Sequence, residues 1–193
     1  AVHLLVSTIE GVMQPRVEKF VGKLDSLISG MEEKMRGLII GDAEFDLDSL
    51  AEGADTTLKV KDEDKPLFEG LNRSVKELKE LRWRYTEGPG GRGRSHMAMT
   101  NSTGCSSVWG STYPYNPYPF PWVNHLFQDA PSIAIGIFEG HMRKMADNFI
   151  SVRRAELRLA DDYDEATHEQ EFVAFDWRDF TEEEFDLCPP ILA

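Results

Sequence analysis

The stretch from Val17 to Leu38, VEKFVGKLDSLISGMEEKMRGL, decides what kind of fold this chain adopts. Its apolar residues recur at steps of seven, with a second set roughly midway between them: Val17, Leu24, Met31 and Leu38, then Phe20, Leu27 and Met35. Spacing of this kind places one apolar stripe along a helix. Glycines within the stretch lower its helix propensity, so the helix needs tertiary packing to hold it. We therefore predict helix packing within one chain, with a coiled-coil dimer as the alternative.

The helical pattern extends over residues 1–40, with one interruption. Pro15 lacks a backbone N–H, and its ring crowds the preceding turn of a helix. We expect a short helix through Met13 and a second helix from about Arg16.

Two more amphipathic helices are expected further along the chain. Apolar residues at helical spacing predict one helix from about residue 66 to 85 and another from beyond residue 131 to about 159. Residues 41–60 read as an acidic loop, and the glycine-rich run 88–94 reads as a flexible, turn-rich link.

The composition of the 193 residues narrows the class of protein. Hydrophobic residues make up 41%, which is enough for a buried core. No apolar run approaches the roughly 18 residues that a membrane span needs, and the first residues lack the pattern of a secretory signal. The net charge of −13 argues against nucleic acid or an anionic membrane as the main partner. Two cysteines do not make a disulfide framework, which favours a cytoplasmic protein.

Most of the negative charge lies between Asp161 and Leu187. Twelve acidic residues there stand against one basic residue, Arg178. Such a run is typical of a solvated acidic face, and a docking patch for a basic partner is the less favoured alternative. Aromatic residues in the same stretch suggest that it lies against the rest of the protein: Phe172, Phe175, Trp177, Phe180 and Phe185.

One segment carries the residue types of a chemical site. Residues 97–101 read as a short buried strand, and Thr103, Gly104, Cys105 and Ser106 follow as a tight turn. The glycine allows close backbone approach, and the amides after it can donate hydrogen bonds. The Cys105 thiol could ligate a metal cluster, act as a nucleophile or stay buried and inert. The residue types alone favour the inert option, because free cysteines are among the most buried residues.

Prolines alternate with aromatic residues over residues 113–122. Alternate prolines forbid a helix or a central strand, so this run should be extended. A rigid covering segment is favoured over a groove for a proline-rich ligand. The histidines, His125 and His141 among them, do not stand at metal-binding spacings.

Three blocks around Cys105 keep a distinctive order and spacing: Asn101-Ser102-Thr103-Gly104-Cys105-Ser106-Ser107-Val108-Trp109-Gly110, then Pro114 and Pro117, then Trp122-Val123-Asn124-His125-Leu126-Phe127-Gln128-Asp129. Together they closely resemble a stretch of the pyruvate:ferredoxin (flavodoxin) oxidoreductase family. The resemblance implies an α/β fold, part of a thiamine-diphosphate-binding domain, that is helix-rich with few strands.

The resemblance also implies a reaction. Family members decarboxylate a 2-oxo acid such as pyruvate on thiamine diphosphate and Mg²⁺. They pass electrons through 4Fe–4S clusters to ferredoxin or flavodoxin, and transfer the acyl group to coenzyme A. By the resemblance, Cys105 is a cluster ligand, and Thr103, Gly104 and Ser106 line the thiamine. A homodimer is implied as well.

The chain contains only some of the residues that the family uses to bind its cofactors and to catalyse the reaction. A 4Fe–4S cluster needs four thiolates, and only Cys105 corresponds to a family ligand, whereas Cys188 reads as structural. The family's Mg²⁺ motif and catalytic glutamate have no counterpart, so no catalytic residue is assigned. We expect residues 1–193 to be an incomplete thiamine-diphosphate-binding domain, inactive alone and completed by the remaining segments of the same enzyme. Residues 11–91 would be a helical insertion of unknown role.

Two alternatives to this enzyme remain open. The chain is then either a non-catalytic helical binding or assembly module with a buried cysteine, or a homologue that has lost the chemistry and keeps the fold as a scaffold.

Overall fold

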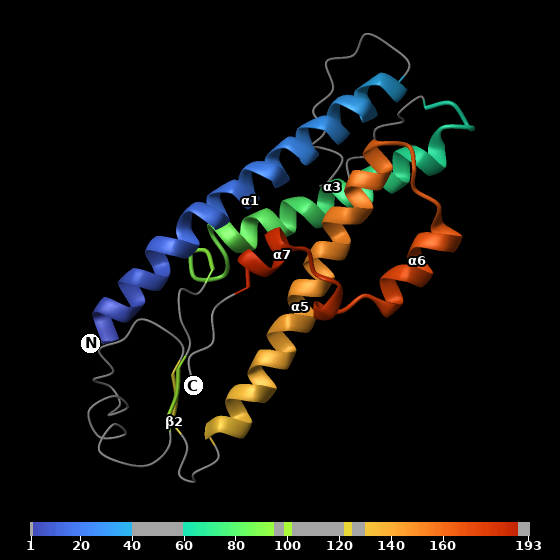
Figure 1. Cartoon of the computed structure of the whole chain (residues 1–193). Coiled ribbons are helices and arrows are strands. Elements are labelled where there is room, and N and C mark those ends of the chain that lie inside the picture. The colour runs from blue at the N-terminus through green and yellow to red at the C-terminus, as the bar shows by residue number, and fades with distance from the viewer. Residues whose placement is uncertain (1, 40–59, 95–98, 102–121, 125–129, 189–193) are drawn as a thin grey trace. The chain divides into compact units, whose positions relative to one another are not determined.

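A computed structural model describes residues 2–39, 60–94, 99–101, 122–124 and 130–188. Helices dominate this part of the chain (Figure 1). The elements in chain order are α1 (Val2–Leu38), α3 (Lys65–Thr86), β1 (Met99–Asn101), β2 (Trp122–Asn124), α5 (Ala130–Leu159), α6 (Glu165–Ala174), the 3-10 helix η1 (Trp177–Asp179) and α7 (Glu182–Asp186). The prediction of a helix-rich chain with few strands is therefore confirmed for the described residues.

The chain divides into two compact units. The strand unit consists of residues 1–17, 86–146 and 176–193, and the helical unit consists of residues 18–85 and 147–175. Both α1 and α5 contribute residues to each unit. Of the predicted insertion, residues 11–91, only residues 18–85 belong to the helical unit, which they share with residues 147–175.

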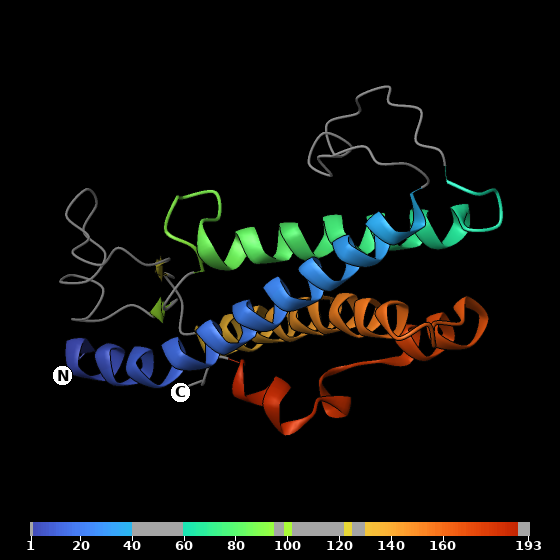
Figure 2. The ribbon, with the colours of Figure 1, turned by 90° about the horizontal axis from the view of Figure 1, so that it is seen from above.

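The helical unit packs the second half of α1, α3 and the second half of α5 side by side, as Figure 1 and Figure 2 both show. Its core is formed by apolar side chains from all three helices: Phe20, Leu24, Leu27, Ile28, Met31, Met35, Phe68, Leu71, Val75, Leu78, Leu81, Phe149, Val152 and Ala155. Leu24 and Met31 are each 0% exposed. The stripe residues from Val17 to Met35 are therefore buried within the chain, whereas Leu38 is half-buried. The predicted helix packing within one chain is confirmed.

Two features fix how closely these helices approach. Gly30 lets α1 approach the end of α5, since a Cβ on Gly30 would lie 3.2 Å from Cδ2 of Leu159. Ion pairs also join the helices at their edges. Lys23 of α1 pairs with Glu156 of α5 at 2.7 Å, and Lys79 of α3 pairs with Glu32 of α1 at 3.0 Å.

Pro15 does not interrupt α1, so the prediction of two separate helices was wrong. A proline inside a helix removes one hydrogen bond and crowds the carbonyl four residues earlier, here that of Gly11. Met13 and Val17, on either side of Pro15, are both buried. Their packing holds both turns in the helix and outweighs the local cost.

The other helix predictions match the structure. The helix expected at about 66–85 is α3, and the one expected from beyond 131 to about 159 is α5. The acidic loop expected at 41–60 lies outside the described residues except for Val60, which forms an antiparallel bridge with Ile39. None of the described helices is both long and apolar enough to cross a membrane.

The strand unit holds β1 and β2, which pair in parallel (Figure 1). Met99 stands opposite Trp122, and Asn101 stands opposite Asn124. The strand expected at 97–101 is thus confirmed over residues 99–101. The proline-rich run 113–121 lies outside the described residues, whereas Trp122, predicted as part of that extended run, opens β2.

The acidic stretch is structured and partly packed, as expected. Phe180 is buried, whereas Trp177 and Phe185 are 47% and 44% exposed. Each of its short helices begins with a side-chain cap, where Asp164, Asp176 and Thr181 accept a backbone N–H. Capping of this kind satisfies amides that the first helical turn leaves without partners.

Candidate functional site

The residues predicted to form the cofactor site lie outside the described part of the chain. Thr103, Gly104, Cys105 and Ser106 all belong to the undescribed range 102–121. Their assignment as cofactor-lining residues, and that of Cys105 as a metal ligand, therefore stay predictions. The described residue nearest to them in sequence is Asn101, the last residue of β1.

The two strands define an edge from which this segment continues. Because β1 and β2 are parallel, their carboxyl ends, at Asn101 and Asn124, lie at the same edge. The chain leaves β1 toward Thr103 and leaves β2 toward His125 from that edge. In open α/β sheets, ligands bind outside the carboxyl ends of parallel strands. The local topology thus suits a binding segment that begins at residue 102.

Cys188, the described cysteine, has the environment of a structural thiol. Its side chain is half-buried, and Sγ lies 3.6 Å from the backbone carbonyl of Glu184, to which it donates. Burial, together with the charge of Glu184, raises the pKa of the Cys188 thiol to about 11. A thiol protonated at neutral pH is a poor metal ligand and nucleophile. The described ranges contain no group of three or more His, Cys, Asp or Glu side chains that could hold a metal ion.

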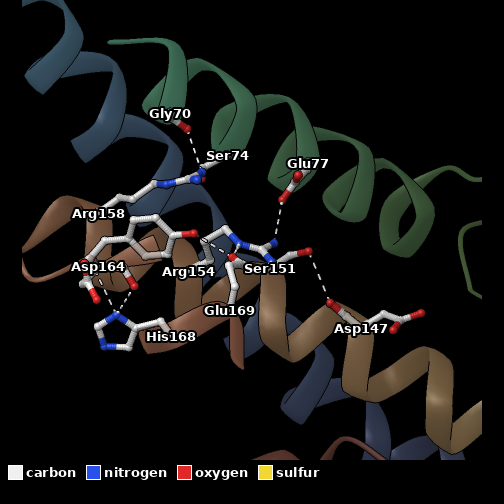
Figure 3. Close-up of polar contacts among 11 residues, drawn as sticks. Gly70, Ser74, Glu77, Asp147, Ser151, Arg154, Arg158, Asp164, His168 and Glu169 are labelled. Carbon is white, nitrogen blue, oxygen red and sulfur yellow. Dashed lines mark hydrogen bonds and ion pairs between the residues drawn. The ribbon is translucent and has the colours of Figure 1, made fainter. Parts of the chain in front are cut away.

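A cluster of charged side chains lies in the helical unit instead (Figure 3). Arg158, in the last turn of α5, is 8% exposed. Its guanidinium donates to the carbonyl of Gly70 at 2.8 Å and to Oγ of Ser74 at 2.6 Å, both on α3. The same guanidinium lies 4.5 Å from the ring centre of Tyr163. A buried charge needs such partners, and Arg158 has both hydrogen-bond acceptors on α3 and the aromatic ring of Tyr163.

Arg154, one turn earlier on α5, pairs with α6. It donates to both carboxylate oxygens of Glu169, at 2.7 and 2.9 Å, and lies 3.6 Å from Glu77 on α3. The hydroxyl of Tyr163 donates to the same Glu169 at 2.6 Å. The hydrogen bond from Arg154 is the main cause that lowers the pKa of Glu169 to about 2. Glu169 is therefore a fixed anion at any physiological pH.

Contacts of aromatic rings complete the attachment of α6. Arg153 lies 4.3 Å from the ring centre of Phe175, and Arg154 lies 5.4 Å from that of Phe172. His168 stacks on Tyr163, with ring centres 5.9 Å apart. No residue of α6 itself is buried, so polar and cation–π contacts hold this helix on α5.

The chemistry of this cluster fits a structural role, in which charged groups hold helices together. The guanidinium groups of Arg154 and Arg158 donate to protein acceptors, and Glu169 is fully ionised by its partners. Such groups hold helices together and do not exchange protons near neutral pH. From the sequence, Glu169 counted only as one of the twelve acidic residues between Asp161 and Leu187. The cluster could have been inferred from the spacing of Arg154 and Arg158, because residues four apart lie on one face of a helix.

Comparisons with known proteins give a partial likeness. No protein-family model matches the chain, and no solved structure matches it. A curated protein that it resembles is the pyruvate dehydrogenase (NADP+) of Cryptosporidium parvum, with 36% identity over 87 residues. The match covers 42% of this chain and 4% of the length of that relative. This likeness supports a relation to the pyruvate oxidoreductases for part of the chain.

Proposed function

We propose that this chain is part of a pyruvate oxidoreductase, in which residues 103–106 contribute to the site where a 2-oxo acid is oxidatively decarboxylated. The observation that carries the proposal is the 36% identity over 87 residues to a pyruvate dehydrogenase (NADP+). The blocks around Cys105 also support it, because they resemble the corresponding stretch of the pyruvate:ferredoxin oxidoreductases. The parallel pair of β1 and β2 is compatible with part of a thiamine-diphosphate-binding α/β fold.

In this proposal the chain's own residues have limited roles. The Cys105 thiolate is one ligand of a 4Fe–4S cluster, and the backbone of Thr103, Gly104 and Ser106 lines thiamine diphosphate. When bound with Mg²⁺, thiamine diphosphate supplies the decarboxylation chemistry, and the cluster supplies one-electron transfer. The other cluster ligands, the Mg²⁺ ligands and the catalytic glutamate come from other segments of the enzyme, which we propose to be a homodimer that uses coenzyme A as acyl acceptor.

The final electron acceptor is a separate part of the proposal. The resemblance around Cys105 favours ferredoxin or flavodoxin, whereas the name of the curated relative gives NADP+. We propose a protein carrier, ferredoxin or flavodoxin, and the assay below includes NADP+ as the competing outcome.

The test compares two cysteine variants in the full-length protein that contains this chain. After anaerobic purification, iron, acid-labile sulfide and thiamine are measured, followed by pyruvate- and coenzyme A-dependent reduction of ferredoxin, flavodoxin and NADP+. Cys105→Ala should lose iron, sulfide and electron transfer. Cys188→Ala is the matched control and should keep them, because the Cys188 thiol is half-buried and protonated.

Three results would contradict the proposal. Unchanged iron content and activity in Cys105→Ala would remove Cys105 from the site. A wild-type protein without iron, sulfide and thiamine would remove the oxidoreductase function altogether. If only NADP+ is reduced, the site assignment stays valid, but NADP+ takes the place of ferredoxin or flavodoxin as the electron acceptor.

A second candidate function is a helical binding or assembly module. The observation that favours it is the helical unit, which has a core of its own built from residues 18–85 and 147–175. This function predicts that Cys105→Ala has no effect on the protein's partners, whereas a loss of the helical core releases them.

A further inference from the structure

Charged residues are unevenly spread along the two longest helices. In α1, residues 2–13 contain one Asp, Glu, Lys or Arg residue, whereas residues 14–38 contain nine. In α5, residues 130–142 contain one, whereas residues 143–159 contain seven. The sparsely charged part of each helix belongs to the strand unit. A helix without a charged face is typical of an element that is buried inside a larger protein.

Apolar side chains in both sparsely charged parts are nevertheless exposed. On α1, Leu5 and Val12 are 45% and 51% exposed, and because they stand seven positions apart they lie along one face of the helix. On α5, Ile135 and Ile137 are 61% and 48% exposed, and because they stand two positions apart they lie about 200° apart around the helix. Exposed apolar side chains that are grouped in this way mark a surface that contacts another protein segment. The scarcity of charge around them favours an apolar partner over an acidic or basic one.

The sheet of the same unit is small. Within the described residues, β1 and β2 form a parallel sheet of two strands with three residues each. A sheet of two strands is marginally stable by itself, and parallel sheets occur almost only where helices cover both faces. Further strands and helices are therefore needed to complete the strand unit. The curated relative is long enough to supply them, since the matched stretch covers only 4% of its length.

We propose that the sparsely charged parts of α1 and α5 are interface helices, on which Leu5, Val12, Ile135 and Ile137 pack against further strands and helices of the same polypeptide. These further segments complete the strand unit as an α/β domain. That the polypeptide is a pyruvate oxidoreductase rests on the proposed function, whereas the covering of the two helices does not.

The first test measures the labelling of introduced cysteines in the full-length protein that contains this chain. Leu5→Cys and Ile135→Cys should react with iodoacetamide about tenfold more slowly than Val173→Cys in the native protein, and at the same rate in urea. Val173→Cys is the matched control, because Val173 is 89% exposed on α6, which has no buried residue and lies in the helical unit. Peptide mass spectrometry gives the rate at each introduced cysteine. Iron, acid-labile sulfide and thiamine are measured on the wild-type protein.

The second test identifies the segments that cover the two helices. Val12 and Ile137 are each replaced by the photo-cross-linking residue p-benzoylphenylalanine in the full-length protein. The cross-links should join these positions to residues outside 1–193 of the same polypeptide, so the mass of the chain on a denaturing gel stays unchanged. Peptide mass spectrometry then gives the segment that is joined.

The outcomes separate this proposal from the proposed function. Equal labelling rates at the three cysteines in the native protein would overturn the covering of the helices. Cross-links that double the mass of the chain would assign the two helices to a contact with a second copy, and cross-links to other residues of 1–193 would assign them to this chain itself, and either result overturns the proposal. If the protein holds no iron, sulfide or thiamine, the proposed function fails, and labelling and cross-linking still decide whether further segments cover α1 and α5.

Discussion

At the scale of single residues, Glu169 shows how partners set the charge of a group. Arg154 holds the pKa of Glu169 at about 2, below its ordinary value of 4.5. A carboxyl with a lowered pKa in the folded state contributes stability above the unfolded pKa. That contribution is lost as the pH falls from about 4.5 toward 2.

Glu169→Gln should therefore lower the free energy of unfolding at pH 7. It should also make that free energy fall less steeply as the pH drops from about 4.5 toward 2. We expect a cost of about 1–2 kcal/mol, less than the full pKa shift would give, because Glu169 is 38% exposed and water screens the pair. Urea unfolding followed by circular dichroism at several values between pH 2 and 7 measures both effects. Glu171→Gln, an exposed acid of the same helix, is the control. Equal losses in the two variants would contradict a specific role of the Arg154 pair.

The second prediction at this scale concerns the reactivity of Cys188. Burial raises the pKa of its thiol from 9.0 to about 11, which lowers the thiolate fraction at neutral pH about 100-fold. Alkylation of Cys188 by iodoacetamide at pH 7.5 should be slow in the folded protein and fast in urea. Peptide mass spectrometry over time gives the rate at this cysteine alone. A rate that is the same with and without urea would show that the thiol is accessible and ionises normally.

At the scale of elements, α1 carries glycines in two different surroundings. A Cβ on Gly22 would meet nothing within 4 Å, whereas one on Gly30 would lie 3.2 Å from Leu159. Both replacements by alanine gain helix propensity, but only one of them crowds a neighbour.

Gly22→Ala should stabilise the chain by about 0.5–1 kcal/mol, which is the usual difference between alanine and glycine inside a helix. Gly30→Ala should gain less or lose stability, because the end of α5 must move to admit the methyl group. Urea midpoints of the two single variants, measured under one condition, decide the order. A larger gain for Gly30→Ala would contradict the close approach of α1 and Leu159.

At the scale of the whole molecule, α1 supplies buried side chains in one part and exposed ones in another. Leu24 is 0% exposed in the helical unit, whereas Leu4 is 74% exposed in the strand unit. A buried leucine loses both its transfer energy and its packing when it is truncated.

Leu24→Ala should destabilise the chain by about 2–5 kcal/mol, and Leu4→Ala by less than about 0.5 kcal/mol. Thermal and urea unfolding of the two variants, which carry the same chemical change in the same helix, test this contrast. Similar losses would mean that the core of the helical unit is not where the structure places it.

Local sequence predicted the long helices of this protein, and a resemblance to a known family supplied its candidate site. Apolar spacing is a property of neighbouring residues, so it predicted α3 and α5 close to their bounds and the buried stripe of α1. The assignment of Thr103, Gly104, Cys105 and Ser106 came from the resemblance of the blocks around Cys105 to a known family, and it stays a prediction because these positions lie outside the described residues.

Only the tertiary structure decided which distant residues meet. The burial of Met13 and Val17 carries α1 through Pro15, against the local preference. The pairs of Arg158 with Ser74, across 84 positions, and of Arg94 with Glu10 join segments whose spacing carries no periodic signal. The physical reason is that such pairs depend on how helices and strands pack, and packing sums the surfaces of the whole chain, whereas helix formation depends on residues a few positions apart.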